Sequence, residues 1–206
     1  TEPLAARAWS DAAAVLGVPD DVIARGLSGA APVPGRFEAV DAGQPFTVIV
    51  DYSHKPDALD QALRAARELV TGEAELTVVF GAGGDRDTAK RPVMGGVAAR
   101  LADHVVLTSD NPRSEDPLAI ISDVHNGIPA GSPVLIEPDR RRAIDLAVAA
   151  ARPGGVVVVA GKGHEATQVI GDRVVPFDDR VVAREALVRL AAAGAAGDIA
   201  RPTKGR

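Results

Sequence analysis

The feature that most constrains the fold of this chain is a series of short apolar segments separated by segments with a helical pattern. Residues 156–160 (VVVVA) are wholly apolar, and residues 47–50 (TVIV) and 76–80 (LTVVF) are nearly so. A strand that is apolar on both faces is typical of a parallel sheet, because helices cover both faces of such a sheet. The pattern therefore predicts an α/β fold: a Rossmann-like, open, mostly parallel sheet with helices on both faces.

Hydrophobic periodicity and the positions of Pro, Gly and Asp give the expected bounds of each element. Strands are expected at 47–50, 76–80, 104–108, 134–136, 156–160, 168–170 and 173–175, the last two flanking a hairpin turn at Gly171-Asp172. Helices are expected at 4–16, 22–27, 56–70, 92–102, 117–124, 139–151 and 178–193. Asp116 is well placed to cap the helix that begins at Pro117.

A run of small residues, Pro and Gly at 28–35 (SGAAPVPG) separates two parts of the chain. Such runs are typical of linkers and domain boundaries. We therefore expect a short helical segment at residues 1–34 and an α/β domain at residues 35–206.

Composition argues against several classes of protein. There are 28 acidic and 23 basic residues, and the resulting net charge of -5 disfavours a nucleic-acid-binding module. The chain has no Cys, which excludes disulfides and thiolate metal sites and suits a reducing compartment. Because it shows neither a membrane-length apolar run nor an export signal, we expect a cytoplasmic protein that does not enter the membrane.

Polar residues gather just after four of the predicted strands. They occupy the segments 51–56 (DYSHKP), 81–87 (GAGGDRD), 109–113 (SDNPR) and 161–165 (GKGHE). Ligands of an open parallel sheet bind at the carboxyl ends of its strands. The four loops are therefore expected to form one site at one edge of the sheet.

The loop at 109–113 carries groups that complement both ends of an amino acid. Asp110 accepts from an ammonium group, Arg113 can hold a carboxylate through two parallel bonds, and Asn111 both donates and accepts. The plainer interpretation is a strand-to-helix turn, in which Asp, Asn and Pro are common. Taken alone, the loop leaves both interpretations open.

The loops at 81–87 and 161–165 are also ambiguous when each is taken alone. Arg86, with Lys90 and Arg91, suits an anion, but it equally suits a solvated basic turn. The glycines match neither a dinucleotide fingerprint nor a P-loop. His164 could act as a base and Glu165 could bind an ammonium group, although a lone His–Glu pair is more often structural and lacks metal-ligand spacing.

The loop at 51–56 places an acid at the strand end and two basic side chains before a helix. His54 and Lys55 in that position suit a polyphosphate or ribose contact. The alternative is a helix N-cap at Ser53 surrounded by solvated charges.

Taken in order, these segments resemble a known family. The series GRFE, VDYSHKPDAL, VVFGAGGDRDTAKRP, TSDNPRSEDP, DR followed by AI, and VVAGKGHE is similar in order and spacing to the C-terminal part of the Mur ligases. Within that family it resembles the MurE-type ligases, which add meso-diaminopimelate to UDP-N-acetylmuramoyl-L-alanyl-D-glutamate. The resemblance covers residues 35–190, and the Ala-rich start resembles the closing helices of the family's central ATPase domain.

The resemblance implies amide-bond formation driven by ATP through an acyl phosphate, in peptidoglycan synthesis and hence in cell wall biogenesis, cell shape and cell division. It assigns meso-diaminopimelate binding to Arg86, Asp110, Asn111, Arg113, Gly161 and Glu165. It assigns ATP contacts to Arg36, Asp51, His54 and Lys55. The DNPR sequence is the family's signature for diaminopimelate, since lysine-adding relatives depart at the Arg position.

The same resemblance implies cofactors that this chain does not hold by itself. The family's P-loop (GTNGKT), its UDP-substrate domain, and the Mg-binding acids and modified lysine of its central domain are absent from the sequence. ATP and Mg²⁺ would therefore be bound mainly by that central domain, and we expect no catalytic or metal-binding residue within this chain. The expected partners are small molecules, namely meso-diaminopimelate, ATP and the UDP-linked muramoyl dipeptide, without an obligate protein partner.

Two other interpretations stay open. The chain would be a stand-alone module that binds an amino acid or nucleotide without catalysis if no P-loop belongs to the same protein. It would be a Mur or folylpolyglutamate-type ligase for another amino acid if the DNPR loop had another specificity, although those relatives resemble the loop less.

Overall fold

The structure is a computed structural model that describes residues 15–28 and 33–199. Its contacts divide the chain into two units, residues 1–34 and 35–206. In the first unit, α2 (Asp20–Ser28) has two acidic residues in its first turn, where they favour a helix N-terminus. The helix expected at 4–16 falls almost wholly outside the described residues. The assignment of residues 1–34 to the end of a central ATPase domain stays a prediction.

The second unit is built on a six-stranded sheet with the order β1-β2-β6-β3-β4-β5. Its strands are β1 (Glu38–Ala39), β2 (Thr47–Asp51), β3 (Leu76–Phe80), β4 (His104–Leu107), β5 (Val134–Ile136) and β6 (Val156–Ala160). Only β1 pairs antiparallel; the other neighbours are parallel, which confirms the expected fold class. The sequence did not predict β1, because two residues are too few to show a period.

Five helices accompany this sheet. They are α3 (Pro56–Arg67), α4 (Lys90–Leu101), α5 (Pro117–His125), α6 (Arg140–Ala150) and α7 (Asp179–Ile199). The helix expected to start at Pro92 begins at Lys90 instead, so its Pro lies in the first turn, where a missing N–H costs no helical bond. Among the described helices, none is both long enough and apolar enough to cross a bilayer.

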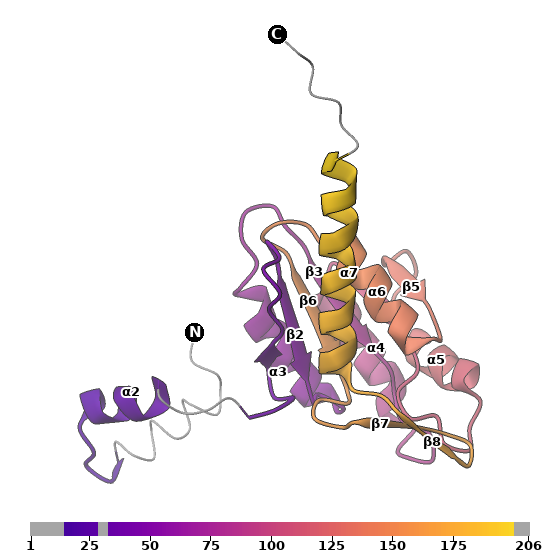
Figure 1. Ribbon diagram of the computed structural model, residues 1–206. Helices are drawn as coiled ribbons and strands as arrows, with labels where there is room; N and C mark the ends of the chain where they lie inside the picture. Colours follow the sequence, from indigo (N-terminus) through magenta and orange to yellow (C-terminus); the bar gives the residue numbers. More distant parts are fainter. Residues whose placement is uncertain (1–14, 29–32, 200–206) are drawn as a thin grey trace. The chain divides into compact units, whose positions relative to one another are not determined.

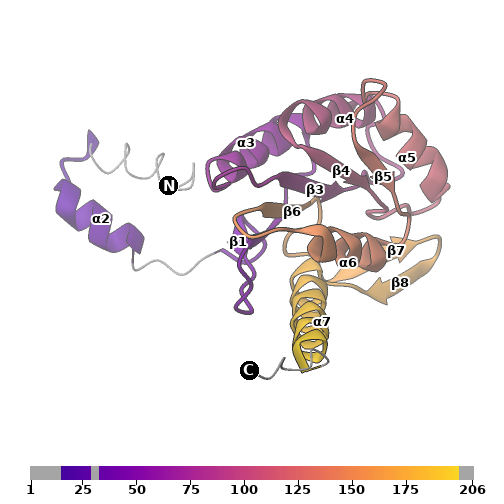
Figure 2. The same cartoon turned by 90° about the horizontal axis from the view of Figure 1, so that it is seen from above.

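The helices cover the two faces of the sheet as separate layers, α3, α4 and α5 on one and α6 and α7 on the other (Figure 2). Successive residues of β6 supply the two cores in turn. Val156, Val158 and Ala160 pack with the first layer, whereas Val157 and Val159 pack with the second. Both faces of this strand are therefore buried, as its uninterrupted apolar sequence predicts.

The register of the sheet brings the ends of its central strands level. Ala160 at the end of β6 pairs with Asp51 of β2 on one side and with Phe80 of β3 on the other, and Phe80 pairs with Leu107 of β4. A separate hairpin, β7 (Thr167–Ile170) and β8 (Arg173–Pro176), lies across this end of the unit and leads into α7 (Figure 1). The expected hairpin is thus confirmed.

Replacing Asp116 with Ala should destabilise the fold through α5. The Asp116 side chain caps this helix by accepting a hydrogen bond from the Leu118 amide at 2.9 Å. Loss of such a cap costs about 0.5–2 kcal/mol, so urea unfolding should show a lower midpoint with an unchanged slope. Asp172→Ala is the matched control, because Asp172 is exposed in the hairpin turn. Equal losses of stability in the two variants would contradict the capping role.

Candidate functional site

The loops after β3 and β4 are tied together at a glycine. The Gly84 amide donates to the Asn111 carbonyl at 2.9 Å, and Arg113 Nη1 donates to the Gly84 carbonyl at 2.8 Å. A Cβ atom at position 84 would lie 1.9 Å from the Pro112 carbonyl oxygen, so only glycine permits this approach. Segments 81–87 and 109–113 therefore meet at the carboxyl edge of the sheet.

Arg113 is held in place by the hairpin. Its backbone has a φ of 52°, a left-handed conformation that is uncommon outside glycine. The Arg113 amide donates to the Val169 carbonyl at 3.1 Å, and its carbonyl accepts from the Gly171 amide at 2.7 Å. Within the described residues, Nη1 is the only guanidinium nitrogen of Arg113 with a hydrogen-bond partner. The remaining donors of the fork are available to a carboxylate.

Asn111, Lys162 and Glu165 form a hydrogen-bonded cluster beside Arg113. Asn111 Nδ2 donates to Glu165 Oε2 at 2.9 Å, while its Oδ1 accepts from Lys162 Nζ at 3.2 Å and from the Val169 amide at 3.0 Å. The fully buried Lys162 also donates to Glu165 Oε2 at 3.2 Å. This cluster joins the loops after β4 and β6 to the hairpin, and it leaves one Asn111 amide hydrogen for a ligand.

The electrostatics of this cluster keep Glu165 ionised. Burial acts to raise the pKa of the Glu165 carboxyl, but the Asn111 hydrogen bond and the charges of Lys162 and Arg113 outweigh it, so the pKa lies below its ordinary range. Arg113 and Glu165 lie at the same edge of the sheet, since the Asn111 side chain that bonds Glu165 also bonds the Val169 amide, and the Val169 carbonyl accepts from the Arg113 amide.

Asp110 is a buried carboxyl group with an open acceptor. Its side chain is 9% exposed, its closest cation is Lys162 Nζ at 3.9 Å, and within the described part of the chain its oxygens accept no hydrogen bond. Burial raises the pKa of Asp110, against the charges of Arg140 and Lys162. A Cβ atom at Gly161, whose φ is 117°, would lie 2.9 Å from Asp110 Oδ2. The missing side chain therefore leaves space beside the carboxylate.

The three basic residues after β3, Arg86, Lys90 and Arg91, do not form the anion site that was one of the two interpretations of this loop. Arg91 is 1% exposed and pairs with Glu115 at 2.8 Å and Asp123 at 2.9 Å, so it is not available to an anion. Lys90 Nζ donates to the His54 carbonyl at 2.7 Å. Of the three, Arg86 is the exposed residue. A Cβ atom built at Gly83 would lie 3.8 Å from Arg86 Cγ and 3.0 Å from Arg113 Nη1, so Arg86 lies near Arg113.

The four residues assigned to ATP lie at the ends of β1 and β2, and Asp51 already has partners there. Its Oδ2 accepts from the Phe37 amide at 2.8 Å, and its Oδ1 accepts from the Ser53 amide at 2.9 Å and from the Ser53 hydroxyl. The alternative of an N-cap at Ser53 is wrong, because α3 is preceded by Lys55 without a side-chain cap. The Asp51 carboxylate therefore fixes the segment around Phe37, at the start of the domain, to the loop after β2.

An aromatic cluster next to Asp51 was not predicted. The Arg36 guanidinium lies 4.4 Å from the centre of the Tyr52 ring, and that ring lies 4.5 Å from the His54 ring and 4.9 Å from the His164 ring. Flat, partly exposed rings of this kind can stack with a planar ligand, and a guanidinium adds a cation–π contact. Lys55 is exposed beside them. A His in each of the two loops, His54 and His164, is the sequence signal from which the cluster could have been inferred.

The two groups of residues meet at Gly161 and Lys90. The Gly161 amide donates to the Asp51 carbonyl at 3.0 Å. Burial lowers the pKa of Lys90, and the charges of Asp110 and Asp87 oppose that change. Lys90, at the start of α4, thus ties the loop after β3 to the backbone of His54, and the loops after β2, β3, β4 and β6 form one continuous edge.

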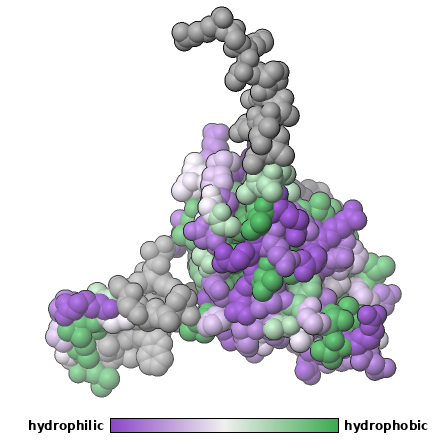
Figure 3. Space-filling model, viewed as in Figure 1, coloured by the Kyte–Doolittle hydropathy of each residue, from purple (hydrophilic) through white to green (hydrophobic). Residues whose placement is uncertain are grey.

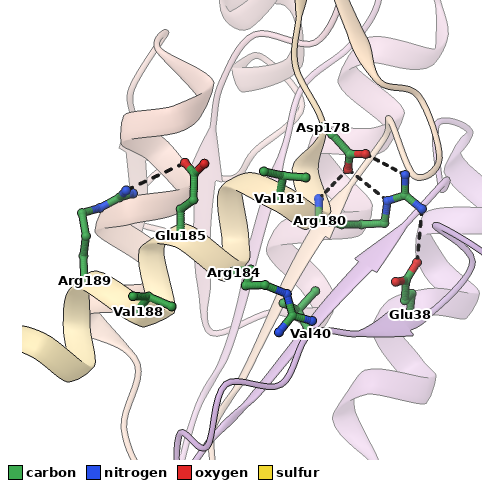
Figure 4. Close-up of a pocket in the computed structure, with 9 residues that line it drawn as sticks. All are labelled: Glu38, Val40, Asp178, Arg180, Val181, Arg184, Glu185, Val188 and Arg189. Atoms are coloured by element: carbon green, nitrogen blue, oxygen red, sulfur yellow. Dashed lines mark hydrogen bonds and ion pairs between the residues drawn. The ribbon is translucent and has the colours of Figure 1, made fainter.

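A groove beside α7 lies outside this edge cluster. It has a volume of about 600 Å³. Its lining residues are Glu38, Val40, Asp178, Arg180, Val181, Arg184, Glu185, Val188 and Arg189 (Figure 4). Hydrophilic and hydrophobic residues are mixed along this face of α7 (Figure 3). Arg180 pairs with Asp178 and Glu38, so these charges satisfy one another, and none of the predicted site residues lines the groove.

No cluster in the described residues is suited to a metal ion. Nowhere in 15–28 or 33–199 do three or more His, Asp or Glu side chains converge. The acidic residues of the edge are instead paired with Lys162, Asn111 or backbone amides.

An Asp110→Asn variant should be more stable than the original chain near neutral pH. Below about pH 4 the carboxyl is protonated in both the folded and the unfolded chain, so the substitution has little effect. As the pH rises, the unfolded chain ionises first because the pKa is raised in the folded state, and the original chain loses stability that the variant keeps. Urea unfolding over this pH range measures the difference.

Asp172→Asn is the control for this pH series, because Asp172 is exposed in the hairpin turn whereas Asp110 is buried. It should show no pH-dependent difference from the original chain. A loss of stability in Asp110→Asn near neutral pH would mean that the buried carboxylate stabilises the fold, contrary to this account.

Comparison with known proteins places the chain in a family. The family model described as "Mur ligase, glutamate ligase domain" matches residues 35–163. UDP-N-acetylmuramoyl-L-alanyl-D-glutamate–2,6-diaminopimelate ligases of Solibacter usitatus (strain Ellin6076) and Geobacillus thermodenitrificans (strain NG80-2) are each 53% identical to this chain. The matches cover 83% and 80% of this chain but 34% of each relative.

Solved structures show the same relationship. A structure of a UDP-N-acetylmuramoyl-L-alanyl-D-glutamate–2,6-diaminopimelate ligase has a TM-score of 0.72 at 39% identity, covering 89% of this chain and 37% of that one. A UDP-N-acetylmuramate-alanine ligase from Thermotoga maritima, at 19% identity and a TM-score of 0.59, shares the fold. This chain spans only part of the length of its relatives, 34% to 37% in these cases. On the match over residues 35–163 and these identities, the chain belongs to the Mur ligase family.

Proposed function

We propose that this chain is the amino-acid-binding part of an ATP-dependent ligase that adds meso-diaminopimelate to UDP-N-acetylmuramoyl-L-alanyl-D-glutamate. The observation that carries the proposal is the placement of Arg113 and Glu165 at one edge, where both are bonded into one network: the Arg113 amide bonds Val169, and the Asn111 side chain bonds both the Val169 amide and Glu165. The names of the relatives that are 53% identical support the choice of substrate.

The charges of the edge complement a diaminopimelate zwitterion. The unused donors of the Arg113 fork, with the exposed Arg86 nearby, suit the carboxylate at the far end of the molecule. Glu165 and Asp110 suit an ammonium group, and the space left by Gly161 admits it beside Asp110. Lysine lacks the distal carboxylate, so it would leave the guanidinium of Arg113 without its ligand.

In the proposed reaction, a carboxylate of the UDP-linked substrate accepts the γ-phosphoryl group of ATP, which gives an acyl phosphate and ADP. The incoming amine attacks the acyl carbon with its lone pair, the C–N bond forms, and phosphate leaves with the electrons of the C–O bond while the nitrogen loses a proton. The residues of this chain bind and orient the amine for that attack, which converts a bimolecular encounter into a positioned one.

On the other half of the edge, we propose that ATP is contacted by Arg36, Asp51, His54 and Lys55, with Tyr52 and His164 offering ring surfaces to the base. Mg²⁺ would neutralise phosphate charge during the transfer. Because the described residues contain no converging set of metal ligands, we assign Mg²⁺ and the phosphates to a central domain outside this chain. A cytoplasmic location accords with these substrates.

Arg113→Ala in the full-length enzyme should weaken the use of diaminopimelate selectively. Loss of a charged hydrogen-bonding partner costs about 2–3 kcal/mol, or roughly 30- to 150-fold in the KM for diaminopimelate. Arg113→Lys should also be impaired, because lysine keeps the charge but lacks the planar fork. Steady-state kinetics with each substrate varied in turn measures both effects, and the KM for ATP should stay nearly unchanged.

Arg173→Ala is the matched control for these variants, since Arg173 lies in the hairpin that holds Arg113 and is exposed. It should behave as the original enzyme does. Should Arg113→Ala change the KM for ATP as strongly as that for diaminopimelate, the role given to Arg113 would be wrong. Equal use of lysine and diaminopimelate by the original enzyme would remove the proposed specificity.

The purified chain should have no ligase turnover by itself. Its sequence contains no GKT or GKS phosphate-binding loop, so nothing in it cradles the β- and γ-phosphates of ATP. ADP release should be undetectable with both substrates present, whereas a full-length homologue in the same assay should release ADP. ADP release by the chain that depends on both substrates would refute the assignment of ATP activation to another domain.

A further inference from the structure

A fully buried ion pair lies directly beneath the edge cluster. Arg140 at the start of α6 and Asp179 at the start of α7 both have side chains with 0% exposure. Arg140 Nε donates to Asp179 Oδ1 at 2.8 Å, and Nη2 donates to Oδ2 at 2.7 Å. The two helices lie side by side on one face of the sheet, and this pair joins their first turns (Figure 2).

The rest of the Arg140 guanidinium points at the sheet. Nη1 donates to the Ser109 carbonyl at 3.2 Å, and Nη2 donates to the Ala160 carbonyl at 2.9 Å. These carbonyls immediately precede Asp110 and Gly161, the residues that face each other across the edge. Arg140 therefore fixes the peptide groups from which both site residues project.

This contact falls where the strand ladder stops. β6 ends at Ala160 and β4 ends at Leu107, two residues before Ser109, so the Ala160 and Ser109 carbonyls need partners from elsewhere if they are to stay buried. A planar guanidinium with five donors can serve two strand ends and a carboxylate at once, which an ammonium group on a single nitrogen cannot do with the same geometry.

We propose, on the basis of the proposed function, that Arg140 is a positioning residue for amino-acid binding, with Asp179 holding its guanidinium in the required plane. Arg140 touches no ligand. It sets the separation and orientation of Asp110 and Gly161, and thereby the space that receives the ammonium group.

Burial of the pair does not by itself explain its presence. Buried ion pairs often contribute little net stability, because desolvation offsets the attraction between the charges. A role in orientation predicts an effect on one substrate in particular, whereas a role in folding alone predicts a general loss of stability. These two outcomes can be separated by measurement.

The test uses the full-length enzyme with Arg140→Lys, Asp179→Asn and a control, Leu63→Ala. Leu63 is fully buried in α3 and belongs to the apolar core, so its truncation lowers stability without touching the edge. We expect Arg140→Lys to raise the KM for diaminopimelate by about 10- to 100-fold, as small misplacements of a binding site do. The KM for ATP should change little, and Asp179→Asn should show a smaller effect of the same kind.

Three results would overturn the proposal. One is a KM for diaminopimelate that stays unchanged in Arg140→Lys. Another is that Leu63→Ala, at an equal loss of melting temperature, changes the KM for diaminopimelate and the KM for ATP in the same way as Arg140→Lys does. If Arg140→Lys fails to fold, Asp179→Asn carries the test, and an unchanged KM for diaminopimelate in that variant is the third. An original enzyme that does not use diaminopimelate at all would instead refute the proposed function.

Discussion

Parallel pairing on both sides of β6 is the constraint on which the rest of the structure depends. The register sets Asp51, Phe80 and Ala160 level, so that the loops that follow β2, β3 and β6 begin at the same height. A slip of β6 by two residues would leave its side chains facing the same layers but would move its loop by about 7 Å. The cluster of Asn111, Lys162 and Glu165 could not form across that displacement. Register, more than the presence of strands, therefore assembles the site.

The charged residues at this edge differ in how fully their charges are paired. This difference distinguishes residues that support the fold from residues that are proposed to bind the ligand. Arg140 and Asp179 satisfy each other and two backbone carbonyls, as a structural pair must when it is fully buried. The carboxylate of Asp110, whose side chain is 9% exposed, accepts no hydrogen bond within the described residues. Carboxylates whose pKa is shifted by burial and that have no fixed protein partner are typical of functional sites.

The fold was largely predictable, and the individual contacts were not. Strands 76–80, 134–136 and 156–160 match their expected bounds because β-branched runs end abruptly at polar loops. The four loops were found by the rule that ligands gather at the carboxyl ends of parallel strands. The role of Arg91 was left open because its partners, Glu115 and Asp123, lie 24 and 32 residues away, a separation that no local pattern reveals. Arg140 appeared only as part of a family motif, since nothing local distinguishes a buried arginine from the exposed ones beside it.

The most direct test of the account is a crystal structure of the full-length enzyme determined with and without meso-diaminopimelate. The account predicts that the bound molecule places one carboxylate on the guanidinium of Arg113 and an ammonium group against Glu165, at the ends of β4 and β6. A ligand seated instead in the groove beside α7, or a complex in which neither residue touches it, would contradict the account.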